Sequence, residues 1–86
     1  MEHAEAPTVT VRYFAAARAA AGTTEQKLAA PTLADLVRTA GAEHGGRLTA
    51  IMSVASFLVD GLVWHDLDAP LPPGATVDVL PPFAGG

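Results

Sequence analysis

The sequence predicts one α+β domain, in which a mixed sheet of about five strands packs on one main helix. The 86 residues suffice for a single hydrophobic core, because two cores of half this size would each bury too little surface. Half of the residues are hydrophobic and 16% are charged, a balance typical of a compact globular protein. Apolar residues recur with strand or helix periods in the order strand, strand, helix, strand, strand, strand.

The first element is a strand over residues 8–14 (TVTVRYF), which is rich in β-branched and aromatic residues. Alternation divides its side chains between two faces, with Val9, Val11 and Tyr13 on one and Thr10, Arg12 and Phe14 on the other. Residues 15–22 (AAARAAAG) predict one or two helical turns that end at Gly22, since alanine favours helices and glycine suits their C-terminal caps. A second strand is expected within 23–30 (TTEQKLAA).

The main helix is predicted within residues 31–46 (PTLADLVRTAGAEHGG). Thr32 can cap its N-terminus, and Asp35 three residues later completes a variant of the capping box. Gly41 is expected to weaken the helix by about 1 kcal/mol relative to alanine, and Gly45-Gly46 to end it. Four apolar residues follow the helical spacing: Leu33, Leu36, Val37 and Ala40. One further short turn is expected in 47–54, with Leu48, Ile51 and Met52 packing inward.

The C-terminal half predicts a hairpin and a last strand. Asp60-Gly61 lies between two apolar runs within 56–67, which is the strongest short-range hairpin signal. Residues 66–68 (DLD) border a proline-rich stretch, so they are expected to start a turn and not to form a catalytic carboxylate pair. The last strand follows within 68–82, with Val77 and Val79 facing inward and Asp78 outward. The domain then covers 8–80, between a flexible N-terminal tail, 1–7, and an extended C-terminal tail, 81–86.

Composition argues against several classes of function. The chain has no cysteine, which excludes disulfides, thiolate metal sites and cysteine nucleophiles. A formal net charge of -4, with five dispersed Lys and Arg, argues against binding to nucleic acid. The longest apolar stretch, 51–59, is far shorter than the ~20 residues that span a bilayer, so no membrane contact is expected. The acidic N-terminus does not resemble a secretory signal, and a cytoplasmic location is expected.

The polar side chains do not form a recognisable active site. His3, His44 and His65 lack the spacing that a metal site needs, so no metal is expected. His44 near the end of the main helix suits the helix dipole, which is a structural role. Ser53 and Ser56 lack the glycine elbow of a nucleophilic serine. The chain is therefore not expected to be an enzyme on its own.

The last eight residues, VLPPFAGG, are the most informative stretch. Pro81-Pro82 cannot extend a strand ladder and favour an extended exit from the domain. From Pro81 to Gly86 the chain can reach up to ~20 Å. Gly85 and Gly86 have no Cβ, so they can enter a channel too narrow for other residues. A terminal carboxylate on such a tail, once activated as a mixed anhydride with AMP, can accept a sulfur or amine nucleophile inside another protein's active site.

The chain resembles the MoaD family, the small sulfur-carrier subunit of molybdopterin synthase within the ubiquitin-like MoaD/ThiS superfamily. The similarity covers 8–86 and is carried by VTVRYFAAARAAAGT at 9–23, PTLADLV at 31–37 and DAPLPPGATVDVLPPFAGG at 68–86. It implies a ubiquitin-like β-grasp fold. Two departures from the family are that the segment 59–71 is one residue longer than expected and that it contains Trp64.

The resemblance implies a sequence of reactions at Gly86. A MoeB-like adenylyltransferase would use ATP to adenylate this residue, which would then become a thiocarboxylate. A MoaE-like large subunit would accept the tail, and the sulfur would pass to cyclic pyranopterin monophosphate. The synthase would be a heterotetramer, and two carriers would be used per product. The carrier itself would hold no cofactor stably.

The same resemblance assigns roles to individual residues. Gly85 and Gly86 match the family's end, Pro81 and Pro82 its rigid exit, and Phe14, Ala15 and Arg18 the FA..R segment after the first strand. Contacts with the large subunit are expected of Phe14, Arg18, Leu80, Pro81, Pro82, Phe83 and Ala84. Ordinary core packing is an equal alternative for Phe14 and Leu80, and a solvated helix charge is the alternative for Arg18.

Two other readings stay open. The chain could carry sulfur for thiamine, cysteine or tRNA thiolation pathways, although ThiS-like carriers are typically shorter and lack the RYFAAAR segment at 12–18. It could also be a ubiquitin-like modifier that transfers its activated glycine to lysine, or an interaction domain. The mass of the C-terminus after activation separates these readings.

Overall fold

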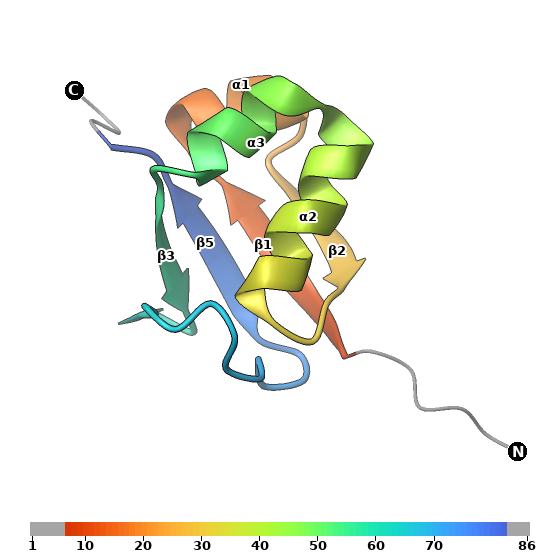
Figure 1. Ribbon diagram of the computed structural model, residues 1–86, viewed down its shortest axis with the longest axis vertical. Coiled ribbons are helices and arrows are strands. Elements are labelled where there is room, and N and C mark those ends of the chain that lie inside the picture. Colours follow the sequence, from red (N-terminus) through yellow and green to blue (C-terminus); the bar gives the residue numbers. More distant parts are fainter. Residues whose placement is uncertain (1–6, 83–86) are drawn as a thin grey trace, which may run out of the picture.

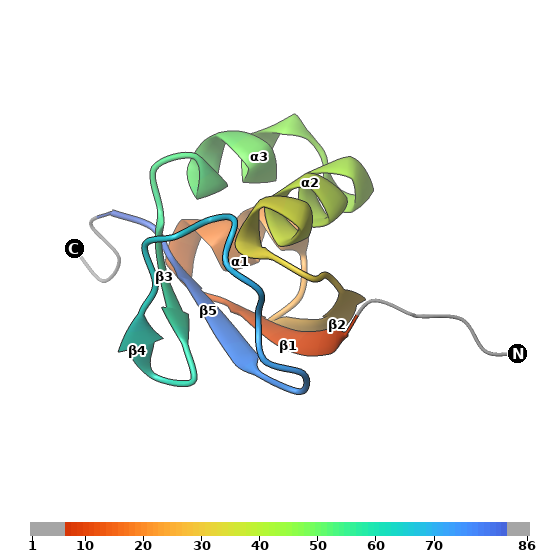
Figure 2. The ribbon, with the colours of Figure 1, turned by 60° about the horizontal axis from the view of Figure 1, so that its bottom comes forward.

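The computed structural model describes residues 7–82 of the chain. The elements are β1 (Thr8–Tyr13), α1 (Ala15–Ala21), β2 (Glu25–Ala29), α2 (Leu33–His44), α3 (Gly46–Met52), β3 (Ser56–Val59), β4 (Leu62–Val63) and β5 (Thr76–Leu80). Figure 2 shows two layers, with the helices covering one face of the sheet. The predicted α+β class and the sheet of five strands are confirmed, whereas the helix layer is larger than one main helix.

The sheet has the strand order β2-β1-β5-β3-β4. The first and last strands, β1 and β5, pair in parallel at its centre, and the other neighbouring strands pair antiparallel. Figure 1 shows β1 and β5 side by side with their arrowheads at the same end. This mixed sheet under a helix layer is the β-grasp arrangement.

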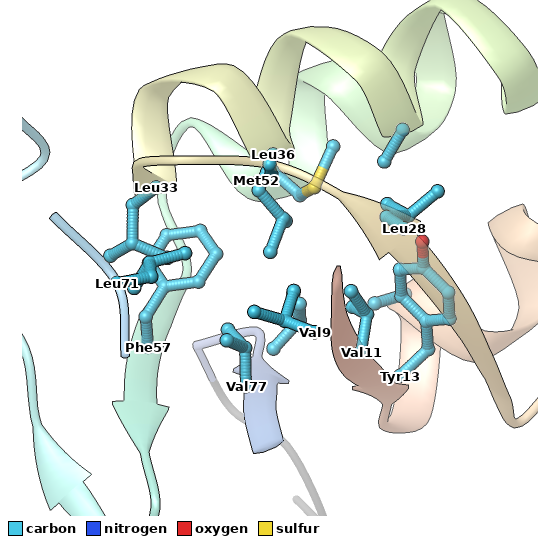
Figure 3. Packing of buried hydrophobic residues seen from close by; sticks show 14 of the residues in the cluster. Val9, Val11, Tyr13, Leu28, Leu33, Leu36, Met52, Phe57, Leu71 and Val77 are labelled. Carbon is cyan, nitrogen blue, oxygen red and sulfur yellow. The ribbon is translucent and has the colours of Figure 1, made fainter. Parts of the chain in front are cut away.

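The core lies between the two layers. The inward alternation predicted for the first and last strands is confirmed, because Val9, Val11, Tyr13, Val77 and Val79 are all at most 1% exposed. Figure 3 shows four of these strand side chains facing Leu33 and Leu36 of α2 and Met52 of α3; the four are Val9, Val11, Tyr13 and Val77. Hydrophobic burial of this kind is the main source of stability in a domain of this size.

Local signals in the sequence explain the ends of α2 and the hairpin. The hydroxyl of Thr32 accepts a hydrogen bond from the main-chain N–H of Asp35 at 3.1 Å, so the predicted cap is confirmed. Asp60 and Gly61 both have positive φ, 50° and 85°, and connect β3 to β4. That is the conformation of a type I′ turn, which the Asp-Gly pair favours. Asp66 also starts a turn, in which its carboxylate accepts the N–H of Asp68 at 2.9 Å.

The structure corrects the prediction for the glycines around α2. The region after Gly45-Gly46 was expected to hold one short turn, but α3 is a seven-residue helix that begins at Gly46. Gly41 was expected only to weaken α2, whereas it is buried where α3 crosses this helix. A Cβ there would overlap the hydroxyl of Thr49, so the glycine permits the close approach of two helices.

The outward direction predicted for Asp78 is confirmed, but its side chain is covered. Its side chain lies on the outward face of β5, as its alternation with Val77 and Val79 requires, yet the residue is only 7% exposed. Arg12, its registered neighbour on β1, donates to both carboxylate oxygens, with Nε–Oδ1 at 2.6 Å and Nη2–Oδ2 at 2.9 Å. A central strand has neighbours on both sides, so an outward side chain on it can still be covered.

Candidate functional site

The candidate site lies where β1 and β5 end together. Because these strands are parallel, their last registered pair, Tyr13 and Val79, brings the residues that follow to the same end of the sheet. The main-chain N–H of Phe14 donates to the carbonyl of Val79 at 3.3 Å. Phe14 and Leu80 are half-buried there, and Pro81 is buried. We call Phe14, Leu80 and Pro81 the tail base, since the C-terminal tail leaves the domain from them.

The chain turns sharply beside the tail base. Phe14 keeps the extended conformation of a strand, with φ -120° and ψ 149°, and acts as the N-cap residue of α1. Ala15 then has φ 51°, in the left-handed region, which costs a residue with a Cβ about 1 kcal/mol. The turn therefore stores a modest strain directly after Phe14, and it directs α1 back over the sheet.

An ion pair supports the tail base from the neighbouring positions on the same face. Arg12 and Asp78 each lie two residues before a member of the tail base, and they form the bidentate pair described above. The Arg12 guanidinium also lies over the Phe14 ring, with Cζ 5.6 Å from the ring centroid. The hydrogen bond from Arg12 to Asp78, together with the carboxylate charge, raises the pKa of Arg12. Arg12 therefore stays charged and holds the ring of Phe14 in place.

The other residues predicted to contact a partner lie in different surroundings. Arg18 is exposed in α1 and makes no salt bridge within the described part of the chain, 7–82. Pro82 is exposed directly after the buried Pro81. Phe83, Ala84, Gly85 and Gly86 lie outside the described residues. The structure thus brings Phe14, Leu80 and Pro81 together, whereas Arg18 lies exposed on α1.

The structure also gives the surroundings of the serine, histidine and acidic residues considered from the sequence. No group of three or more His, Asp or Glu in 7–82 could hold a metal ion. Ser53 and Ser56 are both exposed, and the hydroxyl of Ser53 donates to the carbonyl of Ala50 at 2.6 Å. None of the helices described is long and apolar enough to cross a membrane. The tail base fixes the point at which the chain after β5 leaves the sheet.

Arg12 and Asp78 are the residues near the site that were not singled out from the sequence. Both were placed on the outward face of their strands, and a parallel pairing of the first and last strands would have set them side by side. The signal was an opposite charge at matching positions of two predicted strands. This pattern predicts the ion pair only when the strand order is known, because Arg12 and Asp78 are 66 positions apart in the sequence.

Comparison with known proteins identifies the family. The model of the ThiS family matches residues 11–86, which include β1 from its fourth residue, the tail base and the terminal glycines. The chain belongs to the ThiS family of ubiquitin-like sulfur carriers. No match to this ThiS-family protein was found among curated proteins.

Solved structures similar to this ThiS-family protein include subunits of the molybdopterin-converting factor and archaeal modifier proteins. In the complex of subunits 1 and 2 of the molybdopterin-converting factor from Helicobacter pylori, the matching chain is 25% identical, with a TM-score of 0.67 and coverage of 92% of this chain and 99% of that chain. A Pyrococcus furiosus protein described as a candidate subunit 1 of that factor is 24% identical, with a TM-score of 0.73 and coverage of 90% and 99%. The small archaeal modifier protein 1 from Methanosarcina acetivorans is 23% identical, with a TM-score of 0.79 and coverage of 93% and 97%. These likenesses support the β-grasp fold.

Proposed function

We propose that this ThiS-family protein is the sulfur carrier of molybdenum cofactor biosynthesis, the small subunit of a molybdopterin synthase. Gly86 is adenylated, becomes a thiocarboxylate, and donates its sulfur to cyclic pyranopterin monophosphate. The observation that carries the proposal is the tail base, from which a chain ending in two glycines leaves a rigid sheet. The domain contributes no catalytic group to these reactions, and the partners supply ATP chemistry and the sulfur acceptor.

The chemistry requires a terminus that can be activated away from its own domain. The Gly86 carboxylate attacks the α-phosphorus of ATP, pyrophosphate leaves, and an acyl adenylate results. A sulfur nucleophile then attacks the acyl carbon and AMP leaves, so the terminus becomes a thiocarboxylate. Both steps need space around the carbonyl carbon, and glycine provides it because it has no side chain. The two prolines at the exit limit the directions that the tail can take.

The tail base is also the surface on which partners that hold the tail would dock. Phe14 and Leu80 are half-buried apolar residues, so each keeps part of its surface available for contact. Arg12 fixes the ring of Phe14 from the side, which reduces the entropy lost on docking. A MoaE-like large subunit and a MoeB-like adenylyltransferase are the partners proposed, and the cytoplasm is the proposed location. The Helicobacter pylori complex, in which subunit 1 is bound to subunit 2, supports the first partner.

Intact mass spectrometry after co-expression with a MoeB-like enzyme tests the activation step. We expect one oxygen of the C-terminus to be replaced by sulfur in the full chain. A chain without Gly86, or with one residue added after it, should stay unmodified, and its unfolding temperature should equal that of the full chain. A chain that lacks residues 1–6 is the matched control and should be modified normally. An unmodified full chain would refute the proposal.

A second candidate function is protein modification, which the likeness to the archaeal modifier proteins favours. A modifier uses the same adenylated glycine but forms an isopeptide bond with lysine. The same mass experiment distinguishes the two, because a modifier yields lysine conjugates of partner proteins. Co-purification with a large synthase subunit, lost in the Phe14→Asp and Leu80→Asp variants, would favour the synthase.

A further inference from the structure

A surface pocket of about 340 Å³ lies away from the outward sheet face, between the helix layer and the β3–β4 hairpin. One wall is formed by the end of α3 and the connection to β3, including Met52 and Ser53. The opposite wall is formed by the segment that follows β4, including Trp64 and Leu67. Phe57 of β3 lines the pocket as well. The lining is mainly apolar, so its natural occupant is an apolar group.

Two of the four exposed large hydrophobic side chains of residues 7–82 line this pocket, and the other two are next to lining residues in the sequence. Val63 and Leu67 line it and are 59% and 48% exposed. Leu62, which is 69% exposed, precedes Val63, and Val54, which is 63% exposed, lies between two residues of the opposite wall. A concentration of exposed apolar surface around a pocket is a mark of a binding site and not of random exposure.

The indole of Trp64 is also incompletely satisfied. Its Nε1 is buried, and it has no hydrogen-bond partner within the described part of the chain. Buried donors are nearly always paired, and an unpaired one lowers stability. An occupant with an apolar side chain would fit the apolar lining, and a main-chain carbonyl beside that side chain could accept the N–H of Trp64.

The start of the C-terminal tail lies next to this pocket. Ser56, a lining residue, pairs with Leu80, the last residue of β5. Figures 1 and 2 show that β5 ends beside the connection between α3 and β3. Phe83 lies two positions after Pro81 in the sequence, so their Cα atoms are at most about 7 Å apart. β1 begins at the opposite end of the sheet from the end of β5, since the two strands are parallel.

We propose that in the free chain the phenyl ring of Phe83 occupies this pocket and that a neighbouring tail carbonyl accepts the N–H of Trp64. A ring tethered so close to the pocket has a high effective concentration, so modest contact area suffices for docking. The consequence for the carrier rests on the proposed function. A partner that holds the tail must withdraw Phe83 first, and the free thiocarboxylate is kept against its own domain until then.

The single tryptophan of the chain gives a direct test. The full chain is compared with a Phe83→Asp variant and with Phe83→Leu as the conservative control. In the Asp variant we expect the Trp64 emission to shift to the red, quenching by acrylamide to increase, and the indole N–H resonance to move. The Leu variant should stay close to the full chain. Coincident spectra for the full chain and the Asp variant would overturn the proposal.

Two further measurements distinguish docking within one chain from docking between two copies, and separate this test from that of the proposed function. The Trp64 signals should be independent of protein concentration, and a dependence on concentration would overturn the proposal by showing that the tail of a second copy fills the pocket. The spectra are recorded on the unmodified chain without partners, whereas the proposed function is tested by sulfur incorporation. A failure of docking thus leaves the mass result unaffected, and a failure of thiocarboxylate formation leaves the spectra unaffected.

Discussion

The two edge strands of the sheet, β2 and β4, differ in their side chains: β2 carries a polar network and β4 carries exposed apolar residues. At the β2 edge, Gln26 joins three elements: its side-chain oxygen accepts from Tyr13 Oη of β1 at 2.6 Å and from His44 Nε2 of α2 at 2.6 Å. Its amide nitrogen donates to Glu43 at 3.3 Å. At the β4 edge, a strand of two residues exposes Leu62 and Val63. The polar side chains at the β2 edge form hydrogen bonds within the domain, whereas the apolar side chains at the β4 edge are available for contact with other groups.

The difference indicates that interactions at the β2 edge stabilise the fold and that the β4 edge is the surface available for intermolecular contacts. The β2 edge ties β1, β2 and α2 together through residues that are far apart in the sequence, and the ring of His44 meets that of Tyr13 edge-on at 5.9 Å. Polar networks of this kind favour one arrangement of the elements. At the β4 edge, side chains can be exchanged without disturbing the core, so the surface there is free to serve recognition.

The largest expected effect comes from a matched pair of leucines at the two edges. Leu28 of β2 is 7% exposed and Leu62 of β4 is 69% exposed. We expect Leu28→Ala to lower the free energy of unfolding by about 3 kcal/mol, because it leaves a cavity under α2. Leu62→Ala should change it by less than about 0.5 kcal/mol. Urea unfolding of both variants measures the contrast, and equal losses would show that the edges do not differ.

The next effect is a dependence on pH at the β2 edge. Burial, with a smaller contribution from the charge of Glu43, raises the pKa of Tyr13 to about 12. A raised pKa means that the folded state holds the proton more tightly, so stability is complete below pH ~10, the pKa of an unfolded tyrosine, and falls as pH rises towards 12. The loss should reach about 2 to 3 kcal/mol as pH passes 12. Urea unfolding at increasing pH measures it, and a Tyr13→Phe variant should lack this component.

Removal of the residue that joins the three elements should have a somewhat smaller effect. Gln26→Ala leaves the buried hydroxyl of Tyr13 without its acceptor, and we expect a loss of about 2 kcal/mol in the free energy of unfolding. Lys27→Ala is the control at the neighbouring exposed position, where the ammonium group donates to the hydroxyl of Thr10 at 3.2 Å. This variant should change stability by less than about 0.5 kcal/mol. Similar losses in both variants would mean that the network adds nothing beyond an ordinary strand surface.

The sequence predicts features that depend on neighbouring residues better than those that depend on the packing of distant ones. The Thr32 cap, the Asp60-Gly61 turn and the alternation of the first strand each involve residues a few positions apart, and all three are confirmed. The Gln26 network escaped prediction because its members lie 13 to 18 positions apart and meet only after the sheet and α2 have packed.

The same limit applies at the candidate site. The proline exit and terminal glycines can be read directly from the sequence, as can Phe14 and Leu80 at the ends of two strands. That Phe14 and Leu80 lie side by side follows only from the parallel pairing of β1 with β5. The pocket around Trp64 was equally invisible, since its walls come from α2, α3, β3 and the segment after β4.

The smallest expected effect on the free energy of unfolding comes from the joint between α2 and α3, where these two helices cross. α2 packs over β2, α3 leads to β3, and the helices meet where Gly41 faces Thr49. In Gly41→Ala the added Cβ would force the Thr49 hydroxyl to rotate and lose its contact with the carbonyl of Gly45, now at 3.3 Å. That loss, about 1 kcal/mol, offsets the gain of about 1 kcal/mol from alanine in a helix, so the single variant should be nearly neutral.

A second background separates the two contributions at this joint. With Thr49→Ala already in place, the hydroxyl is gone and Gly41→Ala should stabilise the fold by the full ~1 kcal/mol. Urea unfolding of the four chains gives the coupling energy. If Gly41→Ala instead costs more than about 2 kcal/mol in both backgrounds, the backbones of the two helices and not the Thr49 side chain require the glycine. Close packing of the two helix backbones would then make the helix layer rigid across the joint. The β4 edge, which follows α3 and β3, would in that case be fixed to the domain as firmly as the β2 edge.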